Sequence, residues 1–81
     1  MRVRVLAFAR LRELLGFGER EIDLDAHATL DDAWRAVTVA IPEATRMRAS
    51  TRFARNGVVS DGGVALGEGD EIALLPPVGG G

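Results

Sequence analysis

The end of this 81-residue chain carries its clearest chemical signal, because the sequence closes with Pro76-Pro77-Val78-Gly79-Gly80-Gly81. Proline has no backbone N–H and a fixed φ, so the two prolines end the strand before them and stiffen the exit. The glycines that follow have no side chains, and the terminal carboxylate of Gly81 is the exposed group that could react. Six extended residues reach about 20 Å. The ending therefore predicts a tail that carries a carboxylate into another protein's active site, rather than a frayed terminus.

The composition argues against several kinds of site. The chain has no cysteine, so disulfides, thiolate metal sites and a nucleophilic thiol are excluded. Its single histidine argues against a histidine-based metal site or a serine–histidine hydrolase. The net charge of −2 disfavours nucleic acid as a partner. All ten basic residues are arginine, so a chain without lysine is a poor acceptor for isopeptide conjugation.

Chain organisation is simple. No apolar run is long enough to span a membrane, and the first residues lack the pattern of a signal peptide. We therefore expect a cytoplasmic protein without a membrane partner, built as one globular domain of residues 1–75 followed by a tail of residues 76–81.

Both ends of the globular part read as strands. Residues 2–8 alternate, with the valines and Ala7 on one face and Arg4, Leu6 and Phe8 on the other. Residues 71–75 are apolar on both faces, which is typical of a strand in the middle of a sheet. Between them, residues 10–15 predict a short helix that Gly16 caps, and residues 21–25 predict a second strand.

The middle of the chain predicts one main helix and a hairpin. Thr29 and Asp32 have the spacing of a capping box. The helix continues as an apolar stripe that ends before Pro42, formed by Leu30, Ala33, Trp34, Val37 and Ile41. Residues 52–55 and Val58-Val59 flank Asn56-Gly57, a strong hairpin signal. The glycine-rich loop of residues 60–69 matches no phosphate-binding pattern, and its Val64 and Leu66 are expected to pack under the fold.

These elements predict an α+β fold of the β-grasp type. If the last strand lies parallel to the first, both are central and the main helix covers one face of the sheet. The opposite face would then expose Leu6, Phe8 and Leu75 beside the tail. An apolar patch there, rimmed by Arg4, Arg10 and Arg12, predicts a surface that docks onto a partner protein.

The same residues resemble a known family. The run from Gly69 to Val78, together with the Gly-Gly end, is similar to the small subunits of molybdopterin synthase, which are ubiquitin-like β-grasp sulfur carriers. The resemblance spans nearly the whole chain and also includes Phe8-Ala9, Leu11-Arg12-Glu13-Leu14, Gly16, Thr29-Leu30, Pro42, Ala54, Asn56 and Leu66. Two positions depart from the family pattern, Gly79 in the tail and Arg55 before the hairpin.

The resemblance implies a protein that is not catalytic alone. In this family a ubiquitin-activating-type enzyme uses ATP to adenylate the terminal glycine, here Gly81, and a sulfur donor system converts it to a thiocarboxylate. The tail, here Gly79, Gly80 and Gly81, enters the large synthase subunit in a heterotetramer. Sulfur then passes to cyclic pyranopterin monophosphate to form the molybdopterin dithiolene. No cofactor or metal is expected on the chain itself, and Leu6, Phe8, Arg12 and Leu75 are the expected docking residues.

Two other functions share these features. One is a sulfur carrier of the thiamin, cysteine or tRNA thiolation pathways, although thiamin-type carriers generally lack the short helix expected here. The other is a ubiquitin-like modifier that is joined to amines instead of delivering sulfur.

Overall fold

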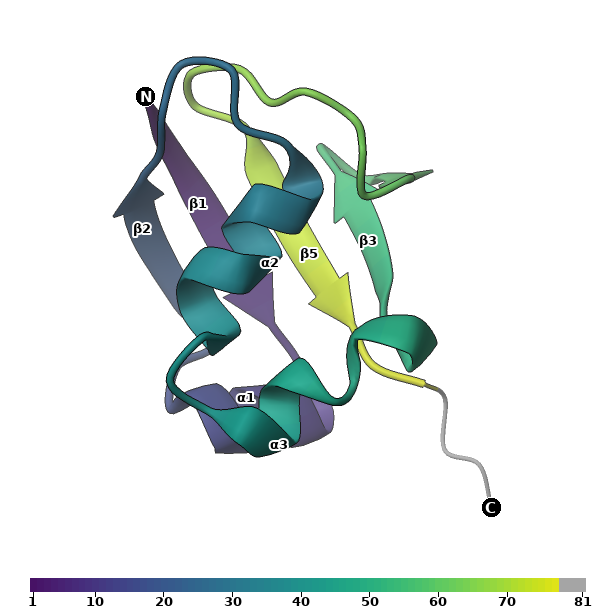
Figure 1. Ribbon diagram of the computed structural model, residues 1–81. Coiled ribbons are helices and arrows are strands. Elements are labelled where there is room, and N and C mark those ends of the chain that lie inside the picture. Colours follow the sequence, from purple (N-terminus) through teal and green to yellow (C-terminus); the bar gives the residue numbers. More distant parts are fainter. Residues whose placement is uncertain (78–81) are drawn as a thin grey trace.

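The computed structural model describes residues 1–77, which fold around one mixed sheet (Figure 1). Five strands lie in the order β2-β1-β5-β3-β4. The strands are β1 (Arg2–Ala7), β2 (Glu19–Asp23), β3 (Arg52–Arg55), β4 (Val58–Ser60) and β5 (Glu71–Leu75). The helices are α1 (Ala9–Leu15), α2 (Leu30–Thr38) and α3 (Pro42–Thr45), followed by the 3₁₀ turn η1 (Arg48–Ser50).

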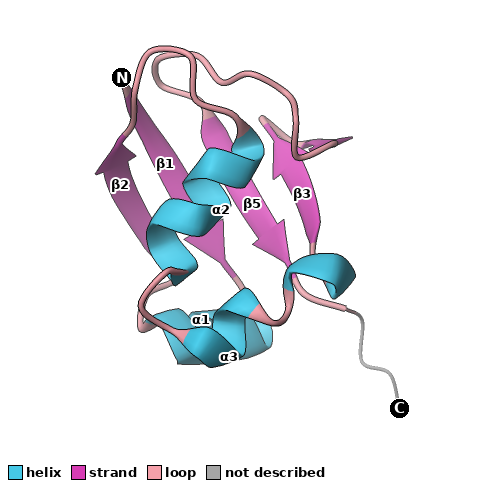
Figure 2. Cartoon of the chain, in the orientation of Figure 1, coloured by secondary structure: helices cyan, strands magenta, loops and turns pink. Residues whose placement is uncertain are grey.

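The first and last strands lie side by side at the centre of the sheet. Strand β1 runs parallel to β5 with Val5 opposite Ile72, and the remaining pairs of strands are antiparallel. Helix α2 crosses one face, while α1 and α3 lie together at the end of the sheet where β1 and β5 terminate (Figure 2). The predicted β-grasp is confirmed, including the parallel central pair and the single helix-covered face.

The hydrophobic core lies between α2 and the sheet. The sheet contributes the predicted inward set of β1 together with Phe53, Ile72 and Leu74, all at most 2% exposed. The apolar stripe of α2 packs onto them, and the rings of Trp34 and Phe53 lie 5.9 Å apart between centroids. Leu66 is buried and Val64 half-buried, so the glycine-rich loop packs against the fold as expected.

Helix α2 begins as predicted but ends early. The Thr29 hydroxyl accepts a hydrogen bond from the Asp32 N–H at 3.2 Å, and Asp32 accepts one from the Thr29 N–H at 2.9 Å. The hydrogen bond from the Thr29 backbone lowers the pKa of Asp32. The helix stops at Thr38, so the prediction that Pro42 ends it is wrong. Ile41 precedes a proline, which disfavours helical ψ, and Pro42 instead occupies the first turn of α3.

Two strand boundaries also differ from expectation. Strand β1 ends at Ala7 rather than at residue 8, because α1 begins at Ala9. Strand β2 covers residues 19–23 rather than 21–25, since its pairing with β1 runs from Glu19 opposite Leu6 to Asp23 opposite Arg2. The alternation at 21–25 marked the exposed side of this strand but not its register.

The hairpin between β3 and β4 is anchored to the start of β5. Asn56 and Gly57 both have positive φ, 50° and 85°, as a tight hairpin turn requires. Asp70 accepts hydrogen bonds from the Arg55 Nε at 2.7 Å, the Asn56 amide at 3.0 Å and the Gly67 N–H at 2.7 Å. Burial opposes ionisation of Asp70, but these donors together hold its pKa below the ordinary value. Arg55, a departure from the family pattern, therefore has a structural partner.

Candidate functional site

The uncovered face of the sheet presents apolar side chains to solvent. Cross-strand register places Leu6 opposite Ala73, Ala73 opposite Ala54, and Ala54 opposite Val59. Residues paired in this way point to the same side of the sheet. We call this surface the docking face and define it as Leu6, Phe8, Val59, Ala73 and Leu75, which surround the buried Ala54, 7% exposed.

Exposure separates the docking face from the core. Phe8 is 44% exposed and Val59 63% exposed, whereas Leu74, the neighbour of Leu75, is fully buried. Leu6 and Leu75 are half-buried. An exposed phenylalanine beside half-buried leucines is the kind of apolar cluster that partner proteins bind. The structure thus favours a surface role for Phe8 and Leu75 over an ordinary core role.

Backbone geometry at the end of β1 sets the position of Phe8. Its φ of −130° and ψ of 154° are extended, so Phe8 continues the alternation of β1 and stays on the side of Leu6. Ala9 then has a φ of 49°, a left-handed conformation that residues with a Cβ adopt at a cost. This bend turns the chain into α1 directly after Phe8. Gly16, with a φ of 81°, ends that helix as predicted.

The charged rim is only partly as expected. The Arg12 guanidinium lies along the backbone at Gly18, where an added Cβ would be 3.1 Å from the guanidinium carbon. Gly18 precedes Glu19, which is paired with Leu6, so Arg12 borders the docking face. Arg4 also lies on this face and donates to Glu71 at 2.6 Å. Arg10 pairs with Glu13 and Glu43 between α1 and α3, so its charge is neutralised within the protein, and its place in the rim stays a prediction.

Reasoning from the sequence missed Val59 on the docking face and Arg52 beside it. The Asn56-Gly57 turn fixes the register of β3 and β4, and that register brings Val59 to the docking face. Arg52 pairs with Leu75 across β3 and β5, so it borders the root of the tail. The hairpin signal could have located Val59. Arg52 requires the long-range β3–β5 register, which no local pattern reveals.

The tail begins beside the docking face. Leu75 and Pro76 are half-buried and Pro77 is exposed. The predicted reactive residues Gly79, Gly80 and Gly81 lie outside the described residues. Across residues 1–77, no group of three His, Asp or Glu side chains is placed to bind a metal ion. The described part of the chain also contains no helix long and apolar enough to cross a membrane.

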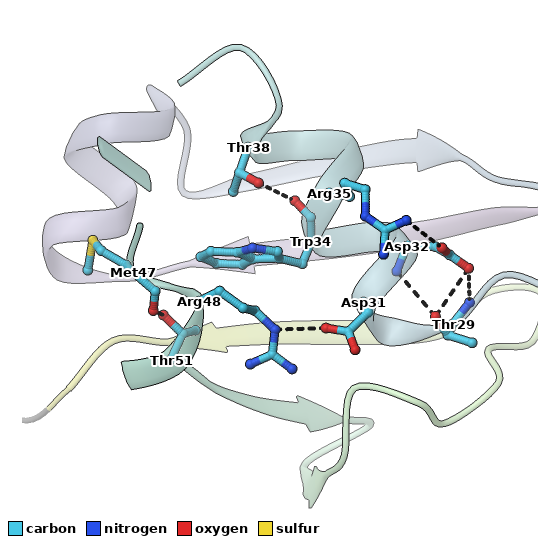
Figure 3. Close-up of polar contacts among 9 residues, drawn as sticks. All are labelled: Thr29, Asp31, Asp32, Trp34, Arg35, Thr38, Met47, Arg48 and Thr51. Carbon is cyan, nitrogen blue, oxygen red and sulfur yellow. Dashed lines mark hydrogen bonds and ion pairs between the residues drawn. The ribbon is translucent and has the colours of Figure 1, made fainter. Parts of the chain in front are cut away.

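The helix side of the sheet bears a groove of about 360 Å³ whose polar groups are already paired. Figure 3 shows the Arg48 side chain reaching Asp31, with 2.7 Å between Nε and Oδ1. In the same view, the Thr38 hydroxyl donates to the Trp34 carbonyl at 2.8 Å. The Arg48 guanidinium also lies 4.3 Å from the centroid of the Phe53 ring. Hydrogen bonding in this groove is thus internal, and the docking face remains the better candidate for function.

Comparison with known proteins points to one family. The sequence profile of the ThiS family matches residues 5–81. The molybdopterin synthase sulfur carrier subunit of Chlamydomonas reinhardtii is 34% identical over 83 residues, and the alignment covers 100% of both chains. Small archaeal modifier protein 1 of Haloferax volcanii is 35% identical over 82 residues, covering 91% of this chain and 94% of the relative.

Solved structures agree with these sequences. The crystal structure of the Haloferax volcanii modifier superposes with a TM-score of 0.86 at 34% identity and covers all of both chains. A complex of subunits 1 and 2 of the molybdopterin-converting factor from Helicobacter pylori contains a chain that matches with a TM-score of 0.69 at 27% identity, again over 100% of both chains. These similarities support both the fold and the possibility of a protein partner.

Proposed function

Because this chain belongs to the ThiS family, we propose that it is the sulfur-carrier subunit of a molybdopterin synthase, with the carboxylate of Gly81 as its reacting group. The observation that carries the proposal is the docking face, which adjoins the strand leading into the tail. Support comes from the Chlamydomonas relative, which bears this function in its name and aligns over its full length.

The chemistry follows from the weakness of a carboxylate as an electrophile. A partner enzyme would join the Gly81 carboxylate to the AMP portion of ATP, releasing pyrophosphate. A sulfur donor would then displace AMP, leaving a thiocarboxylate. In the synthase the thiocarboxylate sulfur would bond to a carbon of the pterin precursor as an oxygen leaves that carbon. Water would then cleave the acyl–sulfur bond, leaving the sulfur on the pterin and a carboxylate on Gly81. The partners must supply the base and the stabilisation of the oxyanion, because the tail offers only its backbone.

Binding energy must come from the body of the protein. Ordering a residue costs roughly 1–2 kcal/mol, so fixing three glycines costs about 3–6 kcal/mol. Glycines recover little of this by apolar burial, whereas each large apolar side chain buried in an interface contributes roughly 1.5–3 kcal/mol. Phe8, Leu6 and Leu75 are the large apolar residues available beside the tail. We therefore propose that they bind the large synthase subunit, with Arg12 at the rim in a charge-assisted contact.

Intact-mass analysis tests the proposal. The chain is incubated with a ubiquitin-activating-type enzyme, ATP and a sulfide source, and the expected product has one sulfur in place of one oxygen. A chain lacking Gly81 should fold normally and gain no sulfur. Gly80→Val should keep its circular dichroism and melting temperature but lose product formation in the synthase, because a side chain would obstruct a narrow passage. Sulfur gain or product formation by the truncated chain would contradict the assignment of Gly81.

A second candidate function is protein modification, which the similarity to the Haloferax volcanii modifier favours. In that case the activated Gly81 would form an amide with an amine of another protein. Peptide mass spectrometry of cell extracts distinguishes the two functions. Target lysines bearing the C-terminal glycines would support modification, whereas a thiocarboxylate without such conjugates supports sulfur transfer.

A further inference from the structure

The arginines of this protein fall into three groups. Within residues 1–77, Arg2, Arg4, Arg10, Arg35, Arg48 and Arg55 form ion pairs with carboxylates. Arg20 lies over the ring of Phe17 at 4.3 Å from its centroid. Arg12, Arg46 and Arg52 take part in none of the ion pairs or ring contacts found in this described part, and all three are exposed.

The three remaining arginines gather at one end of the molecule. Arg12 is in α1 and Arg46 directly follows α3, and Figure 1 places both helices where β1 and β5 terminate. Arg52 begins β3 opposite Leu75, the last residue of β5. The three residues therefore belong to the end of the protein from which the tail departs. We call them the arginine collar.

The net charge of this end of the molecule is opposite in sign to that of the rest. Residues 8–18 and 42–52, which build this end, contain five arginines and two glutamates, a net charge of +3. The other residues contain five arginines and ten acidic residues, a net charge of −5, and together they give the total of −2. A protein with this dipole is oriented by the field of a charged partner before contact, and such steering raises association rates.

From this placement we infer that the arginine collar docks onto an acidic protein surface that surrounds the entrance to the partner's active site. The inference rests on the proposed function, since it assumes that the tail enters such a site. The docking face supplies apolar contact beside the tail root, and the collar supplies positive charge at the same end of the molecule. The observations favour a protein over nucleic acid, because the acidic remainder of the molecule would repel a polyanion along its length.

The test compares two doubly substituted full-length proteins with equal charge changes. Arg46→Gln/Arg52→Gln removes two collar residues, while Arg2→Gln/Arg35→Gln removes two exposed arginines from elsewhere. Association with a purified ubiquitin-activating-type enzyme is measured by stopped flow at low and at high ionic strength. We expect the collar variant to associate about 5–10-fold more slowly at low salt and within about twofold of wild type near 0.5 M salt. The control should stay within about twofold throughout.

Thermal melts should show that both variants are folded, because the substituted side chains are exposed. An identical salt dependence for the collar variant and wild type, or an equal loss in the control, would overturn the inference. Binding of a fluorescent single-stranded oligonucleotide that the collar variant loses, with enzyme association unchanged, would also overturn it. If wild type gains no sulfur but the collar variant still associates more slowly, the proposed pathway fails while the inference stands.

Discussion

The two faces of the central sheet are built from the same kinds of residue but differ in burial. On the helix-covered face, Leu74 and Ile72 are fully buried beneath α2. On the other face, one residue further along the same strand, Leu75 is half-buried and faces solvent. The strand is apolar on both sides, so its composition alone does not distinguish the two faces. The difference is the presence of a helix, and it supports the proposal that the second face carries apolar residues for intermolecular contact rather than for stability.

The strongest way to break this comparison is to truncate neighbours on opposite faces. Leu74→Ala should lower the free energy of unfolding by about 2–5 kcal/mol, because it leaves a cavity in the core. Leu75→Ala should cost far less stability and should weaken partner binding instead. Urea unfolding of both variants measures the contrast. Equal destabilisation would mean that the two faces are equally part of the core.

The next effect concerns binding at the exposed end of the face. Phe8→Ala should weaken association with the large synthase subunit by about 2 kcal/mol or more, the size expected of an interface hot spot. The monomer should lose little stability, since Phe8 is already 44% exposed. Titration calorimetry and a thermal melt on the same variant give both values. A stably folded variant with unchanged binding would remove Phe8 from the docking face.

A third prediction asks whether stability depends on the polar anchor of β5. Asp70→Asn removes a carboxylate that accepts three hydrogen bonds, and it should cost about 1–3 kcal/mol at neutral pH. The folded-state pKa of Asp70 is lowered, so its stabilisation is present above the unfolded value of about 3.9 and is lost as pH falls through the lower folded value. The variant and wild type should therefore begin to converge below about pH 4 and should become equal only below the folded pKa of Asp70. Melts between neutral and acid pH test this, and a constant difference would implicate another group.

The smallest expected change in stability concerns the bend directly after Phe8, where the chain leaves the docking face. Ala9→Gly removes a Cβ from a left-handed residue, which relieves about 1–2 kcal/mol of strain. Glycine loses about 0.5–1 kcal/mol through its greater freedom in the unfolded chain. The variant should thus be about 0.5–1 kcal/mol more stable. Denaturant unfolding measures this gain, and a clear loss would show that Ala9 packs against a neighbour.

Local patterns predicted most of the fold because its elements have strong local signals. The capping box at Thr29, the Asn56-Gly57 turn and the Gly16 cap are all as expected. Boundaries that depend on long-range pairing were less accurate. Strand β2 was displaced by two residues, and α2 ended before the proline that was expected to stop it.

The residues of the candidate site likewise divide into those that local patterns predicted and those that they did not. Strand alternation predicted Leu6, Phe8 and Leu75. A strand that is apolar on both faces exposes one face to solvent wherever a helix covers only the other. The ion pair between Arg10 and Glu43 could not be predicted, because it joins two elements that are distant in sequence. The arginine collar could not be predicted either, as it depends on three segments that meet only in the folded protein.

The position of β5 between β1 and β3 also fixes the point at which the tail leaves the sheet. A slip of one residue along β1 and β3 would push Leu75 into the core and expel Leu74, so the register of this strand is held firmly. The sheet therefore holds the start of the tail at a fixed position. The length of the chain beyond Leu75 then sets how far the tail can reach. Adding or removing one residue there would change the reach of the final carboxylate by about 3.3 Å, more than a reacting atom can tolerate. If Gly81 reacts as proposed, the number of residues after the sheet determines reactivity as much as their identity does.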